Sequence, residues 1–224
     1  MQDRIVLEAR NVSKTVSSPE GLLTILADVS LSVRAAETLA IVGASGAGKS
    51  TLLALLAGLD SPSTGSVSIA GVDLTALDED GRAAIRGRHV GFVFQSFHLI
   101  PSLTAVENVM LPLELLNRRD ARPEAERALD QVGLKARSAH YPKQLSGGEQ
   151  QRVAIARAFV THPAVLFADE PTGNLDTATG QRVTDLLFEL NRSIGSTLVL
   201  VTHDRTLAQR CGRVLELDAG QWLS

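Results

Sequence analysis

Nine consecutive residues, Gly43 to Thr51, combine three glycines with a lysine and three hydroxyl side chains. The spacing matches the Walker A pattern, in which glycines let backbone N–H groups curl around phosphate oxygens without a side-chain clash. We expect Lys49 to reach the β- and γ-phosphates of a nucleotide and the Ser50 hydroxyl to coordinate Mg²⁺. A glycine-rich turn that binds nothing is the alternative. The expected phosphate-binding residues are Gly43, Ala44, Ser45, Gly46, Ala47, Gly48, Lys49, Ser50 and Thr51.

Two adjacent acids, Asp169 and Glu170, follow the apolar run Val165 to Ala168. A strand buried on both faces tolerates charge where it emerges from the core. We expect Asp169 to hold Mg²⁺ through its water shell, and Glu170 to orient or deprotonate the water that attacks the γ-phosphate. A solvated strand end that caps the next turn is the alternative, and the Walker A pattern in the same chain favours the catalytic interpretation.

Polar residues follow two further apolar runs. Gln95 comes after Val90 to Phe94, and His203 comes after Leu198 to Thr202. Ligands of open parallel sheets bind at the carboxyl ends of the strands, where Gly43 and the two acids are also expected. We therefore expect Gln95 to be a metal ligand, and both Gln95 and His203 to be catalytic residues. A neutral His203 could donate a hydrogen bond to the γ-phosphate. Taken singly, each would be an ordinary exposed polar residue.

The elements that must position these residues alternate along the chain. Apolar alternation and short apolar runs predict strands, and capping-box spacing at Thr104 and Ser146 predicts two helix starts. The predicted strands are 29–34, 39–42, 66–69, 165–168 and 197–202, with a terminal hairpin at 214–223. The predicted helices are 49–57, one beginning at Thr104, 124–132, 147–161 and 178–191. Alternation on both sides of a helical block predicts an α/β core with a helical insertion.

Composition limits the possible functions. The chain has 224 residues, 44% of them apolar, and a net charge of −3, which gives no support for binding nucleic acid. Its one cysteine, Cys211, cannot form an intramolecular disulfide and fits a core thiol. No apolar run approaches the roughly 20 residues of a membrane-spanning helix. Met1 to Arg10 lacks the apolar core of a secretory signal, so we expect membrane work to need a partner.

The segment Leu145-Ser146-Gly147-Gly148-Glu149-Gln150 is the most specific motif. Physically it is a helix N-terminus with two glycines and a serine hydroxyl, which suits a phosphate. At this motif the sequence resembles the ABC ATPase family, and the resemblance covers nearly the whole chain. It implies a P-loop NTPase (RecA-like) core with an N-terminal antiparallel β sub-lobe and an inserted α-helical sub-lobe. We expect one domain over 1–224, with a core of about 1–95 and 160–224 and a helical sub-lobe of about 96–159.

The resemblance also implies partners. Two copies would sandwich two ATP molecules, with Ser146, Gly147 and Gly148 contacting the nucleotide of the other copy. The loop Asn174-Leu175-Asp176 would cross the dimer interface, so Asp176 joins the expected nucleotide-binding residues. The stretches 91–97, 145–158 and 167–176 look closest to the subgroup containing LolD, MacB and FtsE, and within it to the YbbA type. Members of this subgroup pair with permeases that have large extracytoplasmic domains, so we expect a place on the inner face of the cell membrane.

One residue departs from the family pattern. The family often stacks adenine on an aromatic residue, and the corresponding position here is Val16. An aliphatic contact buries the base but loses the stacking contribution of about 0.5–1.5 kcal/mol. We therefore expect weaker discrimination between ATP and GTP than in members with an aromatic side chain at this position.

Several interpretations stay open from the sequence. The apolar segment Phe97 to Pro112 fits the core of the helical sub-lobe or, by resemblance, a groove for a helix of the permease. A regulatory ATPase of the FtsE type, which signals to an envelope enzyme, is an alternative to transport. A DNA-repair or translation ATPase is disfavoured because the chain has no coiled-coil insertion or second cassette. A P-loop kinase or GTPase would leave the Ser146 motif unexplained.

Overall fold

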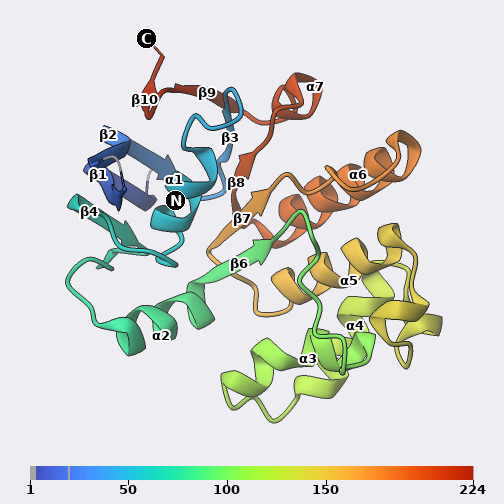
Figure 1. Cartoon of the computed structure of the whole chain (residues 1–224). Helices are drawn as coiled ribbons and strands as arrows, with labels where there is room; N and C mark the ends of the chain where they lie inside the picture. The colour runs from blue at the N-terminus through green and yellow to red at the C-terminus, as the bar shows by residue number, and fades with distance from the viewer. Residues whose placement is uncertain (1–3, 20, 224) are drawn as a thin grey trace. The chain divides into compact units, whose positions relative to one another are not determined.

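The computed structural model describes residues 4–19 and 21–223, and the chain divides into two compact units. The first unit takes in Met1–Arg86 and Thr197–Ser224, and the second takes in Gly87–Ser196. Both contain helices and strands (Figure 1), so the α/β class expected from the sequence is confirmed. The expected limits of the helical sub-lobe, near residues 96 and 159, fall inside the second unit, and that finer division stays a prediction.

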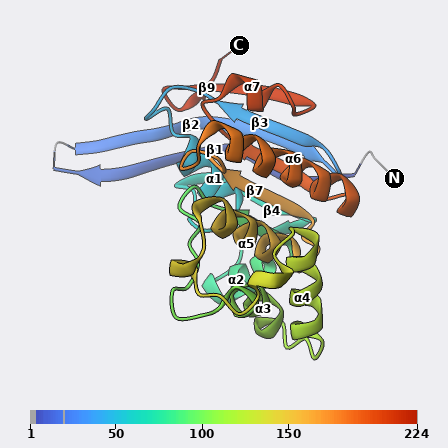
Figure 2. The ribbon, with the colours of Figure 1, turned by 90° about the vertical axis from the view of Figure 1, so that its right-hand side faces the viewer.

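An antiparallel sheet in the first unit has the strand order β2-β1-β4-β5. Figure 2 shows β1 and β2 side by side as a long ribbon. Along β2, Val29, Leu31 and Val33 are buried while the residues between them are exposed, as the alternation in the sequence predicts. The strands of this sheet are β1 (Ile5–Ser18), β2 (Gly21–Arg34), β4 (Thr64–Ile69) and β5 (Val72–Asp73).

The first unit also contains parallel strands. β3 (Thr38–Val42) pairs in parallel with β8 (Thr197–Val201) and with β9 (Arg213–Asp218). β8 is buried along its whole length and β3 nearly so, which explains their continuous apolar sequences. β10 (Gln221–Trp222) pairs antiparallel with β9, which confirms the terminal hairpin.

Helix α1 (Lys49–Leu56) packs against β1, β2, β4 and β8 and buries four leucines. It lies between the antiparallel sheet and the parallel strands of the first unit. Gly58 follows it with a φ of 69°, a left-handed conformation that suits glycine at the end of a helix. A short helix, α7 (Arg205–Ala208), packs against β3.

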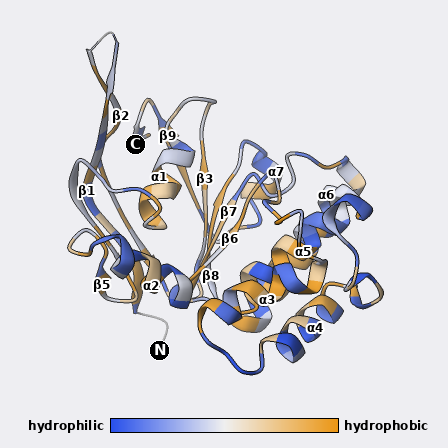
Figure 3. Ribbon diagram, turned by 60° about the horizontal axis from the view of Figure 1, so that its bottom comes forward, coloured by the Kyte–Doolittle hydropathy of each residue, from blue (hydrophilic) through white to orange (hydrophobic). Residues whose placement is uncertain are grey.

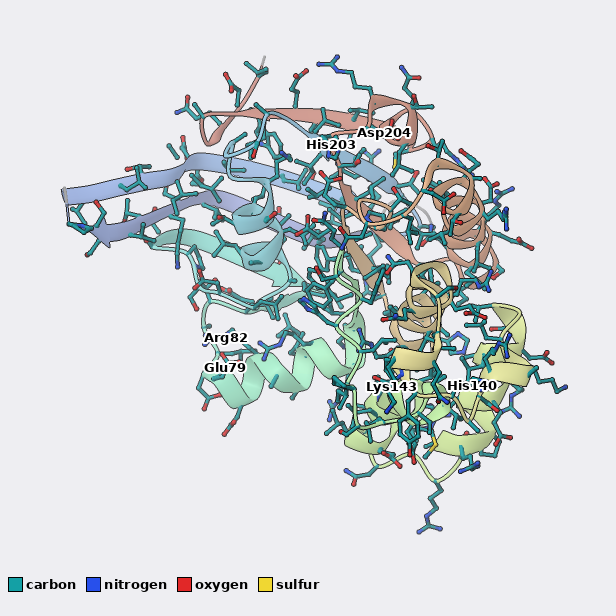
Figure 4. All side chains as sticks on the ribbon, turned by 45° about the vertical axis from the view of Figure 1, so that its right-hand side comes forward. Glu79, Arg82, His140, Lys143, His203 and Asp204 are labelled. Carbon is teal, nitrogen blue, oxygen red and sulfur yellow. The ribbon has the colours of Figure 1, made fainter. Side chains whose placement is uncertain are left out.

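Helix α2 (Glu79–His89) was not predicted from the sequence. It has no buried residues, so it lacks the apolar stripe by which sequence patterns reveal helices. Polar contacts hold it instead: Glu79 pairs with Arg82 and Arg86, and Arg86 Nη1 donates to the backbone oxygen of Gly58 at 2.6 Å. Figure 4 labels Glu79 and Arg82 on this helix. The sequence did contain one indication that a helix starts here, Asp78, a residue type that caps helix N-termini. Its carboxylate accepts the N–H of Gly81 at the start of α2.

The second unit contains one pair of parallel strands and the larger helices. β6 (Val90–Val93) and β7 (Val165–Asp169) run parallel. Helices α3, α4 and α5 contact one another, and Figure 3 shows apolar residues gathered where they meet. α5 also packs against α6 and β6. The helices are α3 (Ala105–Leu115), α4 (Ala121–Gln131), α5 (Gly147–Phe159) and α6 (Thr177–Ile194), with 3₁₀ turns at Lys135–Arg137 and Pro142–Gln144.

Both predicted capping boxes are present. The side chains of Thr104 and Ser146 accept the backbone N–H groups of Glu107 and Glu149, three residues on. In turn, the carboxylates of Glu107 and Glu149 accept the backbone N–H groups of Thr104 and Ser146. The end points of other helices differ from the sequence-based expectation. α4 begins at Ala121 rather than Glu124 because Pro123 is tolerated in a first turn. α6 extends to Ile194, where Gly195 with a φ of 73° ends it.

Candidate functional site

The Walker A segment links β3 to α1 through a loop that needs glycine at two positions. A Cβ on Gly43 would collide with the backbone oxygen of Leu217. Gly48 has a φ of 98° and precedes the first residue of α1. A Cβ there would lie 3.0 Å from the backbone oxygen of Ile25. The loop is therefore shaped by close backbone approach, and glycine-rich loops before a helix can bind phosphate through backbone N–H groups.

Lys49 lies at the start of α1 and folds back over the loop. Its Nζ donates to the backbone oxygens of Gly43 and Ala44, each at 2.8 Å. Ser50 is exposed in the first turn of the same helix. An ammonium, a helix N-terminus and a glycine-shaped loop together fit the phosphates of a nucleotide. The exposed Ser50 hydroxyl is an oxygen ligand of the kind that Mg²⁺ takes alongside phosphates.

His203 lies at the same strand edge as the Walker A loop. Ile41 and Val201 are partners in the β3–β8 register, and Gly43 and His203 follow them by two residues each. Figure 4 shows His203 beside Asp204, which caps α7 by accepting the N–H groups of Thr206 and Leu207. His203 is exposed. The expected grouping of these two positions at one edge is therefore present in the first unit.

Val16 lies on the β1–β2 ribbon, half-buried and directly opposite Leu23. Leu23 is 55% exposed. Ile25, two residues further along β2, lies next to the Walker A loop. A Cβ added to Gly48 would be 3.6 Å from Ile25 Cγ2. An aliphatic surface that includes Val16 thus begins beside the loop expected to hold phosphates.

In the second unit, β6 and β7 bring Gln95 and the two acids to one edge. Val93 and Ala168 are register partners, so Gln95 and Asp169–Glu170 follow at the same end of the strand pair. Glu170 has a φ of 45°, a left-handed conformation that is strained for a residue with a side chain. Strain of this kind concentrates at functional sites. The backbone oxygen of Glu170 accepts the N–H of Gly173 at 3.0 Å, which closes the turn.

Asn174 joins this turn to Gln95. Its Nδ2 donates to the backbone oxygen of Gln95 at 3.0 Å, and Gln95 Nε2 donates to Asn174 Oδ1 at 3.4 Å. Gly173 leaves room for the pair, since a Cβ there would lie 2.7 Å from Gln95 Nε2. The loop that follows the two acids therefore positions Gln95.

Two side chains of α5 reach the same region. The fully buried Gln151 donates through Nε2 to the backbone oxygen of Pro171 at 2.5 Å and to that of Phe94 at 3.5 Å. Arg157 donates to the backbone oxygens of Phe97 at 2.9 Å and His98 at 2.6 Å. Burial lowers the pKa of Arg157 below its usual value, yet a guanidinium remains charged at neutral pH.

Arg157 holds an unusual stretch of backbone. Phe97 and His98 both have a positive φ, 59° and 48°, which is uncommon for two consecutive residues that carry side chains. The His98 ring stacks on Phe94 with centroids 4.4 Å apart. A groove beside this segment is lined by residues that include Phe92, Phe94, Leu111, Pro112 and Leu115, together with His98 and Arg157. Val106 and Val109 are buried, so the segment Phe97 to Pro112 contributes both to the core and to a groove.

The Ser146 motif begins α5. Ser146 is exposed at the N-cap, and Gly147 and Gly148 form the first turn. Gly148 also has a packing role, because a Cβ there would collide with the side chain of Thr179. Thr179 belongs to α6, whose N-cap Asp176 accepts the Thr179 N–H at 3.0 Å. Hydrogen bonds from Thr179 and the backbone hold the pKa of Asp176 below its usual range.

The sequence did not identify Arg137, Gln151 or Arg157 as parts of this arrangement, and it placed Asn174 in the interface loop without predicting its bonds to Gln95. Gln151 left a weak signal, since it is polar on a helix face that is otherwise buried. The partners of the other three are backbone groups or side chains that no local pattern places nearby. Each unit thus carries a helix start suited to phosphate and a strand edge with polar residues. These are the features that an enzyme needs to bind and hydrolyse a nucleoside triphosphate.

Comparisons with known proteins agree with this chemistry. Residues 26–173 match the family model for ABC transporters. The chain is 56% identical over 218 residues to the uncharacterised ABC transporter ATP-binding protein YbbA of Escherichia coli K12, covering 96% of each. It is 49% identical to the lipoprotein-releasing system ATP-binding protein LolD of Bordetella pertussis, covering 96% of this chain and 94% of that one.

A solved structure is also similar. The dimeric post-hydrolysis state of the ATP-binding cassette MJ0796 with ADP and phosphate has a TM-score of 0.90, with 41% identity over 97% of each chain. Among the helices of the described residues, none has the length and apolar character needed to cross a membrane.

Proposed function

This chain belongs to the ABC transporter family of ATP-binding proteins, and from that premise we propose that two copies close on two ATP molecules and drive a separate membrane permease. The chain is an ATP-binding and ATP-hydrolysing subunit of this family. The observation that carries the proposal is that the chain has two separate helix starts suited to phosphate, at Lys49 and at Ser146. A nucleotide in the Walker A loop of one copy would meet the Ser146 motif of the other.

In this proposal each site residue has a defined role in binding or hydrolysing ATP. Lys49 and the loop N–H groups hold the β- and γ-phosphates, and Ser50, Gln95 and Asp169 supply the oxygen ligands suited to Mg²⁺. Glu170 orients a water and accepts its proton as the water oxygen bonds to the γ-phosphorus and the bond to the β-phosphate oxygen breaks. His203 donates a hydrogen bond to the γ-phosphate. Ser146, Gly147, Gly148 and Asp176 contact the nucleotide held by the other copy, and Val16 covers the base.

A substitution at Glu170 tests the catalytic part of this proposal. Glu170→Gln keeps the shape of the side chain but removes the base, so we expect ATP binding to persist while turnover falls about 10²-fold or more. Dimers should accumulate with ATP and Mg²⁺ and be detected by sedimentation. The control is Glu189→Gln, which removes one carboxylate from an exposed position on α6. Unchanged turnover in Glu170→Gln would remove Glu170 from this role.

The membrane partner is the second part of the proposal. The groove beside Phe94 and His98 offers aromatic and aliphatic walls for a helical segment of the permease. Leu115, at one side of the groove, is 75% exposed, as a residue of an unoccupied contact surface would be. The similarity to a protein named for a lipoprotein-releasing system supports a membrane partner for this chain. We place this chain on the inner face of the cell membrane, bound to a permease that has an extracytoplasmic domain. The similarity favours a transport role over a purely regulatory one.

The groove is tested by co-purification. Leu115→Asp should leave ATP turnover of the isolated subunit unchanged but prevent recovery of the detergent-solubilised permease that co-purifies with the tagged wild-type chain. Leu59→Asp, at a 49% exposed leucine of the first unit, is the matched control. Equal recovery with Leu115→Asp and wild type would contradict this placement of the partner.

A further inference from the structure

The Ser146 hydroxyl is already engaged as a donor. Glu149 Oε2 accepts the Ser146 backbone N–H at 2.8 Å and the Ser146 hydroxyl at 2.9 Å. A serine hydroxyl has one hydrogen, so it cannot donate to this carboxylate and to a phosphate at the same time. The hydroxyl has to turn away from Glu149 before it can bind a phosphate through that hydrogen.

Glu149 also places a negative charge beside the position expected for the γ-phosphate of the other copy's nucleotide. The carboxylate lies one hydrogen bond from Ser146 Oγ, and hydrogen bonds with Ser146 and Arg137 hold the pKa of Glu149 below its usual range. A γ-phosphate held by Ser146 would therefore lie close to a fully ionised carboxylate. Like charges at such a separation repel, and the repulsion weakens binding unless a cation offsets it.

Arg137 is the cation in position to do so. Its Nε lies 3.1 Å from Glu149 Oε1, the carboxylate oxygen that Ser146 does not use. Arg137 ends the 3₁₀ turn that precedes the motif by several residues, in the segment that contains His140 and Lys143 (Figure 4). Its Nη1 lies 3.4 Å from His140 Nε2. The Glu149 side chain is 20% exposed and that of Arg137 49%, so the pair lies at the surface with its carboxylate partly shielded.

We propose that Arg137 is a positioning residue for the nucleotide of the other copy: it offsets the charge of Glu149 and so allows Ser146 to turn its hydroxyl toward the γ-phosphate. The proposal rests on the proposed function, since it takes Ser146 to meet that nucleotide. Arg137 acts through Glu149 and need not touch the phosphate. Its contribution depends on the Glu149 charge, which separates it from a merely structural role.

A double-mutant cycle tests that dependence. The variants Arg137→Gln, Glu149→Gln and the double variant are made in the Glu170→Gln background, and the ATP concentration for half-maximal dimerisation is measured by sedimentation. We expect Arg137→Gln to raise this concentration about two- to fivefold, the range of a partly exposed ion pair. Glutamine at position 149 can keep the capping box, so Arg137→Gln should have no effect in the Glu149→Gln background. Equal losses in both backgrounds, or no loss in either, would overturn the proposal.

Further measurements separate the possible failures. Binding of ATP to the monomer should be unchanged in Arg137→Gln, and its dimerisation defect should shrink at 0.5 M NaCl because salt screens the charges. Arg122→Gln is the matched control, since it removes an exposed arginine paired with Glu126 on α4. If Arg137→Gln lowers the melting temperature, Arg137→Lys tests whether a retained charge restores dimerisation, and failure to restore it counts against the proposal. If Ser146→Ala dimerises as well as wild type, the proposed function itself fails at this motif.

Discussion

Asn174 and Gln95 form a reciprocal amide pair: Asn174 Nδ2 donates to the Gln95 backbone oxygen at 3.0 Å, and Gln95 Nε2 lies 3.4 Å from Asn174 Oδ1. The two residues are 79 positions apart in the chain. The pair connects the turn after Glu170 with the segment that leads to the groove. A residue proposed to act on water or metal is thereby held by the loop proposed to cross the dimer interface.

We predict that Asn174→Leu, which removes both hydrogen bonds at similar volume, lowers kcat about three- to tenfold with little change in ATP affinity. The reason is that a typical hydrogen bond contributes about 0.5–1.5 kcal/mol, and here the loss disorders Gln95 rather than the Walker A loop. Steady-state ATPase assays and equilibrium nucleotide binding measure the two effects. Gln181→Leu, which removes an exposed amide on α6, should match wild type. A loss of ATP affinity as large as the loss of kcat would contradict the prediction.

The two kinds of glycine in the Walker A loop should respond differently to alanine. Gly43→Ala places a Cβ against the Leu217 backbone oxygen and should destabilise the fold by about 1–3 kcal/mol. Gly46 has a φ of 82° but open space around a Cβ, so Gly46→Ala should cost about 1 kcal/mol through backbone strain alone. Urea unfolding measures both. A smaller loss for Gly43→Ala than for Gly46→Ala would show that the loop yields at Leu217.

Arg157 should stabilise the segment Phe97–His98. Arg157→Leu removes two charged hydrogen bonds to backbone oxygens and should lower the free energy of unfolding by about 1.5–3 kcal/mol. Arg157→Lys should be intermediate, because one ammonium reproduces the planar fork poorly. Arg119→Leu, at an exposed position, should stay within about 0.5 kcal/mol of wild type. Chemical denaturation provides the values, and equal stabilities of Arg157→Leu and wild type would be incompatible with this role.

Val16 should set the strength of base binding. Val16→Tyr restores a stacking surface, and we expect ATP to bind about two- to tenfold more tightly, from about 0.5–1.5 kcal/mol of added interaction, with a higher preference over GTP. Competition binding with both nucleotides measures the ratio. Val214→Tyr adds the same ring at an exposed position elsewhere in the first unit and should leave the ratio unchanged. A strong ATP preference in the wild-type chain would contradict the interpretation of Val16.

Cys211 should be unreactive in the folded chain. Burial raises the pKa of its thiol to about 12, against about 8.5 in an unfolded chain, so folding favours the protonated form. This contribution to stability is present below about pH 8.5 and is lost as the pH rises toward 12. Iodoacetamide at pH 8.5 should modify Cys211 at least about tenfold faster in urea than in buffer. Equal rates would show that the thiol is exposed.

Local sequence signals predicted the parts of the fold that local physics determines. The capping boxes at Thr104 and Ser146 were predicted because each depends on residues a few positions apart. Helix α2 was missed because it buries no residue and depends on Glu79, Arg82 and an arginine bond to the end of another helix. Its stabilisation comes from specific pairs rather than from a periodic apolar face.

The sequence by itself determined the glycine-rich loop, the two acids at the end of β7 and the serine-led helix start, because each is a set of contiguous residues with fixed spacing. Tertiary structure decided which side chains support them: Asn174 on Gln95, Arg157 on Phe97 and His98, and Arg137 on Glu149. These contacts join residues from 12 to 79 positions apart. No local pattern encodes such pairs, since they form when strand pairing and helix packing have brought distant backbone segments together.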